Sequence, residues 1–441
     1  MTAVSPTADR PIRVRLPLLL AFAGFVLLGV ISASAGVLLP AQMSDYGVDR
    51  ATIGITFFMV SAGFVIAGLA SGALISRLGL RMTLITGGAA YALSGLCLAI
   101  RPPFAVFVAV QVLVGYGTGI LETVLQAYIA PRPGATTLLN RLHAFWGVGA
   151  LTGPVLASWL LGFTSWRAVL LVLALVFVPL TAAFALFPRG LSTHGAERPV
   201  VPLPGPGTRS REPARNLLGA GLRDRGVLAG AVMLSVYVGL EIGVGNWAYS
   251  YLVQGRGLGG TLAGYSVSGY WLGLTAGRFL ISPLAQWAGL TTTRMMYGCL
   301  AGITAASALA WLAPEAAAAS AALVLLGFFL GPVFPTTMSV TPAFTAPELV
   351  PTAIGVMNAG SVIGGSALPW LAGVIGQEAG LWTLLPYAIV LALFQFAAWR
   401  PLAARIRSAG TTRRELRRLG SPPERLALSY VVRNFMCQDT G

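Results

Sequence analysis

The sequence predicts an all-α membrane protein whose twelve transmembrane helices form two pseudo-symmetric six-helix bundles. Of the 441 residues, 56% are hydrophobic and only 10% are charged, and the mean hydropathy is +0.77. The apolar residues come in runs of about 20, the length that a helix needs to cross a bilayer. A segment rich in proline and arginine divides these runs into two sets of six.

The basic residues, all of them arginine, indicate how these helices are oriented. The formal net charge is +15, yet only Arg50, Arg101, Arg167 and Arg256 fall in predicted external segments. Nearly all the others lie in the alternate, internal segments, which is the positive-inside pattern of multi-pass membrane proteins. We therefore expect a multi-pass protein of the cytoplasmic (inner) membrane with both termini in the cytoplasm, and we expect no binding of nucleic acid.

The first six-helix bundle is predicted over residues 1–187. The first nine residues lack the apolar core and cleavage site of a signal peptide, so the first apolar run is expected to be a retained span. The predicted spans cover about 16–40, 51–75, 82–100, a stretch ending near 130, 142–162 and 168–187.

Composition changes abruptly over residues 188–226, where prolines alternate with arginines. Such a segment cannot bury enough apolar surface to fold alone, so we predict a cytoplasmic linker. The second bundle is predicted over 227–403, with spans near 227–253, 261–288, 295–313, 316–340, 352–375 and 382–399. Residues 404–441 form a basic cytoplasmic tail, either a helix lying on anionic lipid or a solvated topological anchor.

Small residues predict which spans lie inside the bundles. Pairs of glycines four residues apart let helix backbones approach closely in lipid. They occur at 68/72, 115/119, 149/153, 239/243, 298/302, 327/331 and 360/364, and as a triplet at 269/273/277. None occurs in the third, sixth or twelfth span, and the sixth has Thr181 as its only polar side chain between Ala168 and Phe187. We expect the sixth span to face lipid on the outside.

Two acidic residues lie within apolar spans, Glu122 in the fourth and Glu241 in the seventh. A carboxylate in a membrane helix costs about 2.5–3.5 kcal/mol on insertion scales, so it usually faces a watery or protein-lined interior and marks a functional site. Thr118, Glu122 and Gln126 recur at helical spacing and form one polar stripe. A cavity carboxylate that opens alternately to each side could bind and release a proton or coordinate sodium; the alternative is a Glu held neutral or hydrogen-bonded between helices.

Arg278 is the basic residue placed inside a span of the second half. It lies at a depth in the membrane similar to that of Glu122, so the depths of the two side chains would allow an ion pair across the cavity. Glu241 lies some seven residues deeper, about 10 Å along a helix, which argues against a direct pair with Arg278. A gating role and a substrate contact both remain open for Arg278.

The two halves also resemble each other. Gly72–Ser76 leads into an arginine-bearing turn after the second span, and Arg278–Ser282 occupies the same place after the eighth. Parallel repeats of this kind place a substrate between them, near the bilayer midplane, with alternating access by rocking of the halves.

These features, with Gly72, Arg77, Gly79 and Arg81 after the second span, resemble the major facilitator superfamily over nearly the whole chain. The resemblance implies the major facilitator fold, and a gating role for Arg77, Arg81 and Arg278. Within the superfamily the chain is most similar to the fucose-permease-like sugar:cation symporters, on Leu121–Thr123, Leu139–Leu151 and Leu38–Pro40.

In that group an acid of the fourth span is implicated in substrate binding and proton coupling, and Glu122 matches it. The acid of the first span falls at Gly36 here, and two amide positions of the fifth span are His143 and Trp146. The segments Tyr237–Leu252 and Gly269–Arg278 resemble a broader branch that includes sodium-coupled glucose carriers, which suggests that Glu241 supplies the missing acid.

Aromatic and amide side chains complete the candidate site. Trp247, Tyr270 and Trp271 could stack on a sugar ring, and Gln126, Asn246 and Asn358 could bond its hydroxyls. Aromatic residues also gather at membrane interfaces for unrelated reasons. His143 could titrate near neutral pH or serve only in packing.

No GxSxG, HExxH, complete GxGxxG or P-loop motif occurs in the sequence, which argues against an enzyme and against ATP-driven transport. We expect a monomeric secondary transporter that moves a small polar solute, a sugar or sugar-like compound, by cation-coupled alternating access. Proton-coupled efflux of drugs or metabolites is the alternative. The expected partners are the solute, membrane lipid and a coupling ion, H⁺ or Na⁺; no cofactor and no metal site are expected.

Overall fold

The computed structural model describes residues 10–132, 135–186 and 214–418, and within these ranges every regular element is a helix. The first half contains α1 (Arg10–Tyr46), α2 (Arg50–Ile53), α3 (Ile55–Ala99), α4 (Phe104–Ile129), α5 (Ala135–Leu161), α6 (Trp166–Ala183) and η1 (Phe184–Leu186). The helices that follow are α7 (Ala214–Arg223), α8 (Arg225–Ser250), η2 (Tyr251–Gly255), α9 (Gly260–Trp287), α10 (Thr292–Leu312), α11 (Ala316–Leu330), α12 (Val333–Ser339), η3 (Thr341–Ala343), η4 (Pro347–Leu349), α13 (Val350–Glu378), η5 (Leu381–Thr383) and α14 (Leu384–Arg418).

Ten of the described helical segments are long and apolar enough to cross a membrane. One of them, Arg50–Ala99, has 50 residues and covers the second and third predicted spans. α3 bends between these spans at Gly79, whose φ of 77° lies in the region that favours glycine. α9 is not among the ten, but its 28 residues extend about 42 Å, enough for a crossing. The helices therefore account for the twelve predicted crossings, and the predicted all-α membrane fold is confirmed.

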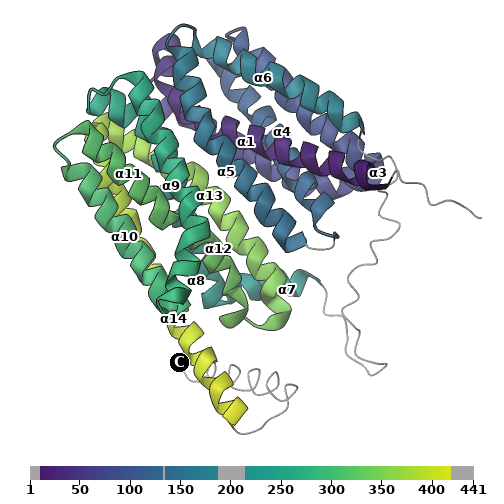
Figure 1. The fold of residues 1–441 in the computed structure, drawn as a ribbon, viewed down its shortest axis with the longest axis vertical. Coiled ribbons are helices and arrows are strands. Elements are labelled where there is room, and N and C mark those ends of the chain that lie inside the picture. The colour runs from purple at the N-terminus through teal and green to yellow at the C-terminus, as the bar shows by residue number, and fades with distance from the viewer. Residues whose placement is uncertain (1–9, 133–134, 187–213, 419–441) are drawn as a thin grey trace, which may run out of the picture.

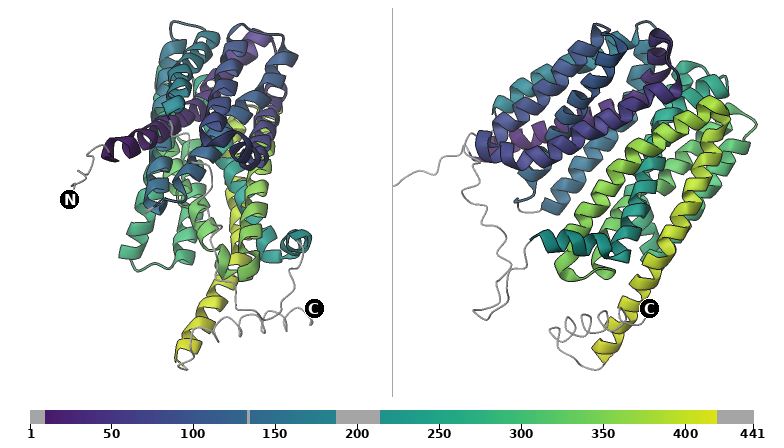
Figure 2. Two further views of the ribbon diagram at one scale, coloured as in Figure 1. Left: turned by 90° about the vertical axis from the view of Figure 1, so that its right-hand side faces the viewer. Right: turned by 180° about the vertical axis from the view of Figure 1, so that it is seen from behind.

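The helices gather into two groups, α1–α6 and α8–α14, which lie side by side (Figures 1 and 2). In the first group α1 packs on α5 and α3 packs on α4 and α6; in the second α8 packs on α13 and α14, and α9 on α11. The groups meet mainly where α5 packs on α9, α1 on α8, and α13 on α2 and α3. Each group brings together helices from one half of the sequence.

Glycine packing explains several of these close pairs. A Cβ added at Gly149 would lie 1.9 Å from the Val26 carbonyl oxygen, and one at Gly277 would lie 1.9 Å from that of Phe328. Any larger residue would force α1 from α5 and α9 from α11. Gly68 and Gly72 were expected to serve the same purpose, but both face open space in this structure.

α6 lies at the outside of the first group, as predicted. It packs mainly on α3, where the Phe177 ring lies 4.5 Å from that of Tyr91, while Trp166 packs on Tyr46 of α1 and Phe107 of α4. Its opposite face exposes Leu175 and Val178, to 52% and 46%. Exposed apolar side chains on a membrane helix are suited to contact with lipid.

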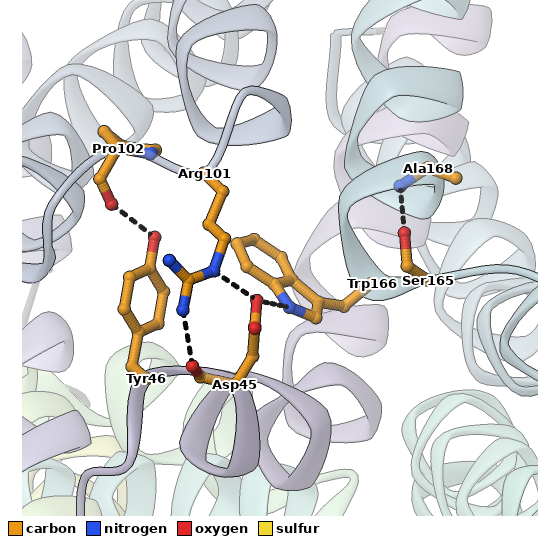
Figure 3. Close-up of polar contacts among 7 residues, drawn as sticks. All are labelled: Asp45, Tyr46, Arg101, Pro102, Ser165, Trp166 and Ala168. Atoms are coloured by element: carbon orange, nitrogen blue, oxygen red, sulfur yellow. Dashed lines mark hydrogen bonds and ion pairs between the residues drawn. The ribbon is translucent and has the colours of Figure 1, made fainter.

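A polar cluster ties three elements together at the C-terminal end of α1 (Figure 3). Arg101 Nε and Trp166 Nε1 each donate to Asp45 Oδ2 at 3.0 Å, and Arg101 Nη2 donates to the Asp45 carbonyl oxygen at 2.6 Å. The Tyr46 hydroxyl donates to the Pro102 carbonyl oxygen at 2.8 Å. These contacts join α1 to the α3–α4 turn and to the start of α6, so they hold the first group together at this end.

Three element boundaries differ from the sequence prediction. The expected single span over 316–340 is broken between α11 and α12, because Pro332 cannot donate a helical hydrogen bond and Gly331 precedes it. The expected linker over 188–226 contains α7; its residues 188–213 lie outside the described part of the chain. α14 continues past residue 403 to Arg418, so the first part of the expected tail is helical.

Candidate functional site

A cavity of about 1010 Å³ lies between the two groups of helices. Its walls come from α1, α3, α4, α5 and α6 of the first group and from α8, α9, α12 and α13 of the second. It reaches Asn140, Ser282 and Ser339, which lie close to the ends of α5, α9 and α12 farthest from α2. The expected central cavity is therefore present, and it extends toward the end of the bundle opposite α2.

Glu122 enters this cavity from α4. A Cβ at Gly117 or Gly119 would clash with α3, at 2.7 Å from Tyr91 N and 2.8 Å from Ala67 Cβ, so these glycines set the face of α4 that packs on α3. Another face then presents Thr118 and Glu122 to the cavity. Gln126 lies one turn further on and donates from Nε2 to Glu122 Oε1 at 3.3 Å, without lining the cavity itself.

Glu241 enters the cavity from α8 and pairs with Arg278 of α9. Arg278 Nη2 lies 3.1 Å from Glu241 Oε1, and the two side chains are 27% and 8% exposed. The Tyr270 hydroxyl donates to the Glu241 carbonyl oxygen at 2.9 Å. Because the acid is nearly buried, the guanidinium is the group that compensates its charge.

The expectation that depth would prevent this pair was wrong. In a helix each side chain leans toward the N-terminus. α8 and α9 are consecutive and run in opposite directions, so the Glu241 and Arg278 side chains lean toward one another and cover the difference in level. No pair between Arg278 and Glu122 is seen in the described residues; Glu122 bonds Gln126 instead.

Aromatic side chains from both halves surround Arg278. The Trp146 ring of α5 lies 5.9 Å from the guanidinium carbon and meets the Trp271 ring of α9 edge to face at 5.7 Å. His143 of α5 also lines the cavity and packs edge to face on Phe25, with ring centroids 5.6 Å apart. The structure therefore brings residues of the fifth, seventh and eighth spans to one place.

Of four other predicted site residues, three lie outside the cavity wall. Trp247 is 1% exposed and donates from Nε1 to the Pro369 carbonyl oxygen at 2.8 Å, so it packs between α8 and α13. Tyr270 does not line the cavity; its hydroxyl bonds the backbone carbonyl oxygen of Glu241. Asn358 is exposed on α13 and does not line the cavity. Asn246 does line it.

The predicted gating arginines Arg77 and Arg81 flank the bend of α3 at Gly79. Neither lines the cavity, and the ion pairs of the described residues do not include them. Their gating role stays a prediction.

The sequence analysis missed further polar residues of the wall, among them Gln42, Gln111 and Asn140. Gln111 could have been found, because it continues the Thr118 and Glu122 stripe toward the start of α4 at helical spacing. Asn140 could have been found as well, because it lies three residues before His143 on the same face of α5.

The groups are joined at the α2 end through Arg50. Its Nη2 donates to Gln254 Oε1 of η2 at 2.9 Å, and its Nη1 lies 3.4 Å from the Gly376 carbonyl oxygen of α13. Trp370 Nε1 donates to the Ala51 carbonyl oxygen at 3.1 Å. The cavity is thus closed at the α2 end by contacts between the halves.

Among the described residues there is no group of three or more His, Cys, Asp or Glu side chains that could hold a metal ion. The acidic and basic side chains that line the cavity are Glu122, His143, Glu241 and Arg278. They are suited to binding polar or charged solutes and to binding and releasing cations.

Two groups of membrane-crossing helices around a central cavity that contains two acids and an arginine, closed at one end, define a solute transporter rather than an enzyme. Residues 20–369 match the family model of the Major Facilitator Superfamily. The chain belongs to this superfamily.

Relatives support this class. The yeast protein "Bypass of stop codon protein 6" from Saccharomyces cerevisiae is 24% identical over 81% of this chain and 76% of its own length. The 4-hydroxybenzoate transporter PcaK of Pseudomonas aeruginosa is 28% identical over 38% of each chain. A glucose/galactose transporter of Brucella abortus is 23% identical over 60% of this chain and 65% of that one.

A solved structure shares the fold. A bacterial homologue of the human lysosomal transporter Spinster, in an inward-facing and unoccupied conformation, has a TM-score of 0.69 with 12% identity, covering 91% of this chain and 99% of that one.

Proposed function

We propose that the protein is a cation-coupled secondary transporter of a small, polar, ring-bearing solute, a sugar or a sugar-like compound. The observation that carries this proposal is that Glu122, on a membrane helix, lines the cavity between the halves. A carboxylate on a membrane helix carries a free-energy cost of insertion, so its presence there indicates a function.

Glu122 is proposed as the site of the coupling ion, H⁺ or Na⁺. It has one bond from a neutral amide, Gln126, whereas Glu241 is paired with Arg278. Glu122 is therefore the acid of the cavity whose charge is not compensated by an arginine. Rocking of the halves would expose it to each side of the membrane in turn, with the ion bound on one side and released on the other.

The proposed solute contacts both halves. Trp146 and Trp271 offer aromatic faces for a ring, and Asn246 and Glu122 offer hydrogen-bond partners for hydroxyl groups. The name of the glucose/galactose relative supports a sugar, and that of PcaK supports a hydroxylated ring.

The arginine distribution supports an orientation in the cytoplasmic membrane in which both termini lie in the cytoplasm and the α2 end of the protein faces outside. The described structure would then be closed to the outside. The protein is proposed to act as a monomer surrounded by lipid.

Uptake into proteoliposomes tests the proposal. Purified protein should accumulate a labelled solute, screened from sugars and sugar-like compounds, when a proton or sodium gradient is imposed. Glu122→Gln should strongly lower gradient-driven accumulation and retain part of the exchange of labelled for unlabelled solute. Glu315→Gln, at an exposed acid outside the cavity, is the matched control and should behave like the wild type. Unchanged driven accumulation by Glu122→Gln would remove this residue from the mechanism.

Proton-coupled efflux of drugs or metabolites is the second candidate. Much of the cavity wall is phenylalanine and leucine, including Phe25, Leu28 and Phe64, which suits apolar compounds. Accumulation of a lipophilic cation in exchange for protons, with no sugar accumulated, would favour this alternative.

A further inference from the structure

Arg278 uses little of its bonding capacity in this structure. A guanidinium carries five N–H donors in a fixed fork. Its acidic partner is Glu241 Oε1, at 3.1 Å from Nη2; the Tyr237 side chain also adjoins it, and its buried Nε has no partner in the described residues. A carboxylate matches the geometry of this fork and can bind it through two parallel bonds. Arg278 therefore has unused donors at a cavity wall.

The surroundings of Arg278 favour a ring or a polyol next to that carboxylate. Trp146 lies 5.9 Å from the guanidinium carbon and meets Trp271, and these side chains belong to different halves. A ligand anchored on Arg278 would touch both tryptophans, and so would contact both halves at once. Asn246 lies in the same cavity and can bond hydroxyl groups.

Charge balance decides what else must bind. Two acids, Glu122 and Glu241, and one arginine, Arg278, line the cavity. If both acids stayed ionised, a bound anion would leave three negative charges against one positive charge in a site of low dielectric constant. Protonation of Glu241 leaves two negative charges against one and frees Arg278 for the anion, and a cation bound at Glu122 then balances the site. The titratable groups that face the pair are Tyr237 on α8, Tyr270 on α9 and His143 on α5.

We propose that the solute is a hydroxylated monocarboxylate that takes Arg278 from Glu241, and that Glu241 binds one proton for each anion bound. This inference rests on the proposed transport function and specifies its substrate. The proton comes from the side on which the solute binds. On release, the anion leaves Arg278, Glu241 loses its proton, and the Glu241–Arg278 pair re-forms as seen here. Glu122 binds the coupling ion as before.

Matched acid and neutral solutes test the substrate class. Purified wild-type protein in proteoliposomes is assayed with D-galacturonate against D-galactose, and with 4-hydroxybenzoate against 4-hydroxybenzamide. At least one acid should be taken up with a kcat/KM at least 10-fold above that of its neutral partner, and the pair that responds distinguishes a sugar acid from an aromatic acid. Preference for both neutral partners would overturn the inference. If galactose accumulates in a Glu122-dependent way and neither acid does, the proposed function stands and this inference fails. If no solute accumulates under a gradient, both fail.

Variants of the pair test the roles of its residues. Arg278→Gln should raise the KM for the acid at least 10-fold, and Arg278→Lys should recover part of the loss, because lysine keeps the charge without the fork. Glu241→Gln should keep uptake of the acid but move one proton fewer per molecule, measured as the ratio of proton flux to solute flux. Arg294→Gln, at an exposed arginine, is the control.

A binding assay distinguishes a variant that has lost solute binding from one that fails to fold. The acid should raise the Tm of detergent-purified wild type and Arg278→Lys, and should leave that of Arg278→Gln unchanged. An unchanged KM in Arg278→Gln, or an unchanged proton ratio in Glu241→Gln, would contradict the proposal.

Discussion

Arg50 is the side chain whose removal should most directly change the balance between the two orientations of the cavity. It donates from Nη2 to Gln254 Oε1 at 2.9 Å, while its contacts with the Gly376 and Gln377 oxygens, at 3.4 and 3.5 Å, are at the limit of a hydrogen bond. A hydrogen bond from a charged donor contributes about 1.5–3 kcal/mol, less where the partners are exposed. Counting the one short bond and discounting it for exposure gives about 1–2 kcal/mol, which corresponds to about a 5–30-fold shift in population.

Arg50→Ala should therefore increase the fraction of molecules open at the α2 end about 5–30-fold. The shift can be measured by placing one spin label in each half at that end and recording the distance distribution by pulsed electron paramagnetic resonance. Arg223→Ala, at an exposed arginine of α7, is the control. An unchanged distribution in Arg50→Ala would refute the idea that this side chain holds the α2 end closed.

Three further predictions concern stability. Gly149→Ala should lower the Tm, because its Cβ would lie 1.9 Å from a carbonyl oxygen of α1, whereas Gly68→Ala, with open space around it, should leave the Tm unchanged or raise it slightly. Asp224→Ala should cost about 0.5–2 kcal/mol of unfolding free energy in detergent, because Asp224 accepts from the Gly226 and Val227 amides that begin α8. A double-mutant cycle of Asp45→Asn and Arg101→Gln should give a coupling below about 1 kcal/mol, since both side chains are partly exposed; a larger value would show that the cluster of Figure 3 is stronger than an exposed pair.

The architecture was accessible from the sequence because bilayer crossing demands long apolar runs, and such runs are visible without any knowledge of packing. The outer position of α6 followed from its lack of glycine pairs and polar residues. The bend at Gly79 and the break at Pro332 were harder to predict, since a long apolar run can hide a change of direction.

Prediction of the site was less complete, for a geometric reason. Periodicity located Glu122 and Thr118 on one face, because both lie on one helix. The Glu241–Arg278 pair joins two helices, so it depends on the direction in which each side chain leans as well as on depth along the chain. Trp247 could not be separated from Trp271 by residue type, although one is buried against α13 and the other lines the cavity.

The proposed coupling role of Glu122 is tested most directly by the ion movement that accompanies the solute. Wild-type proteoliposomes given an accepted solute without an imposed ion gradient should take up H⁺ or Na⁺ together with it, recorded by an internal pH or sodium indicator. Glu122→Gln should move no coupling ion through this site while still exchanging labelled solute, so its ion flux per solute should fall by one. Equal ion flux per solute in the two proteins would contradict the account.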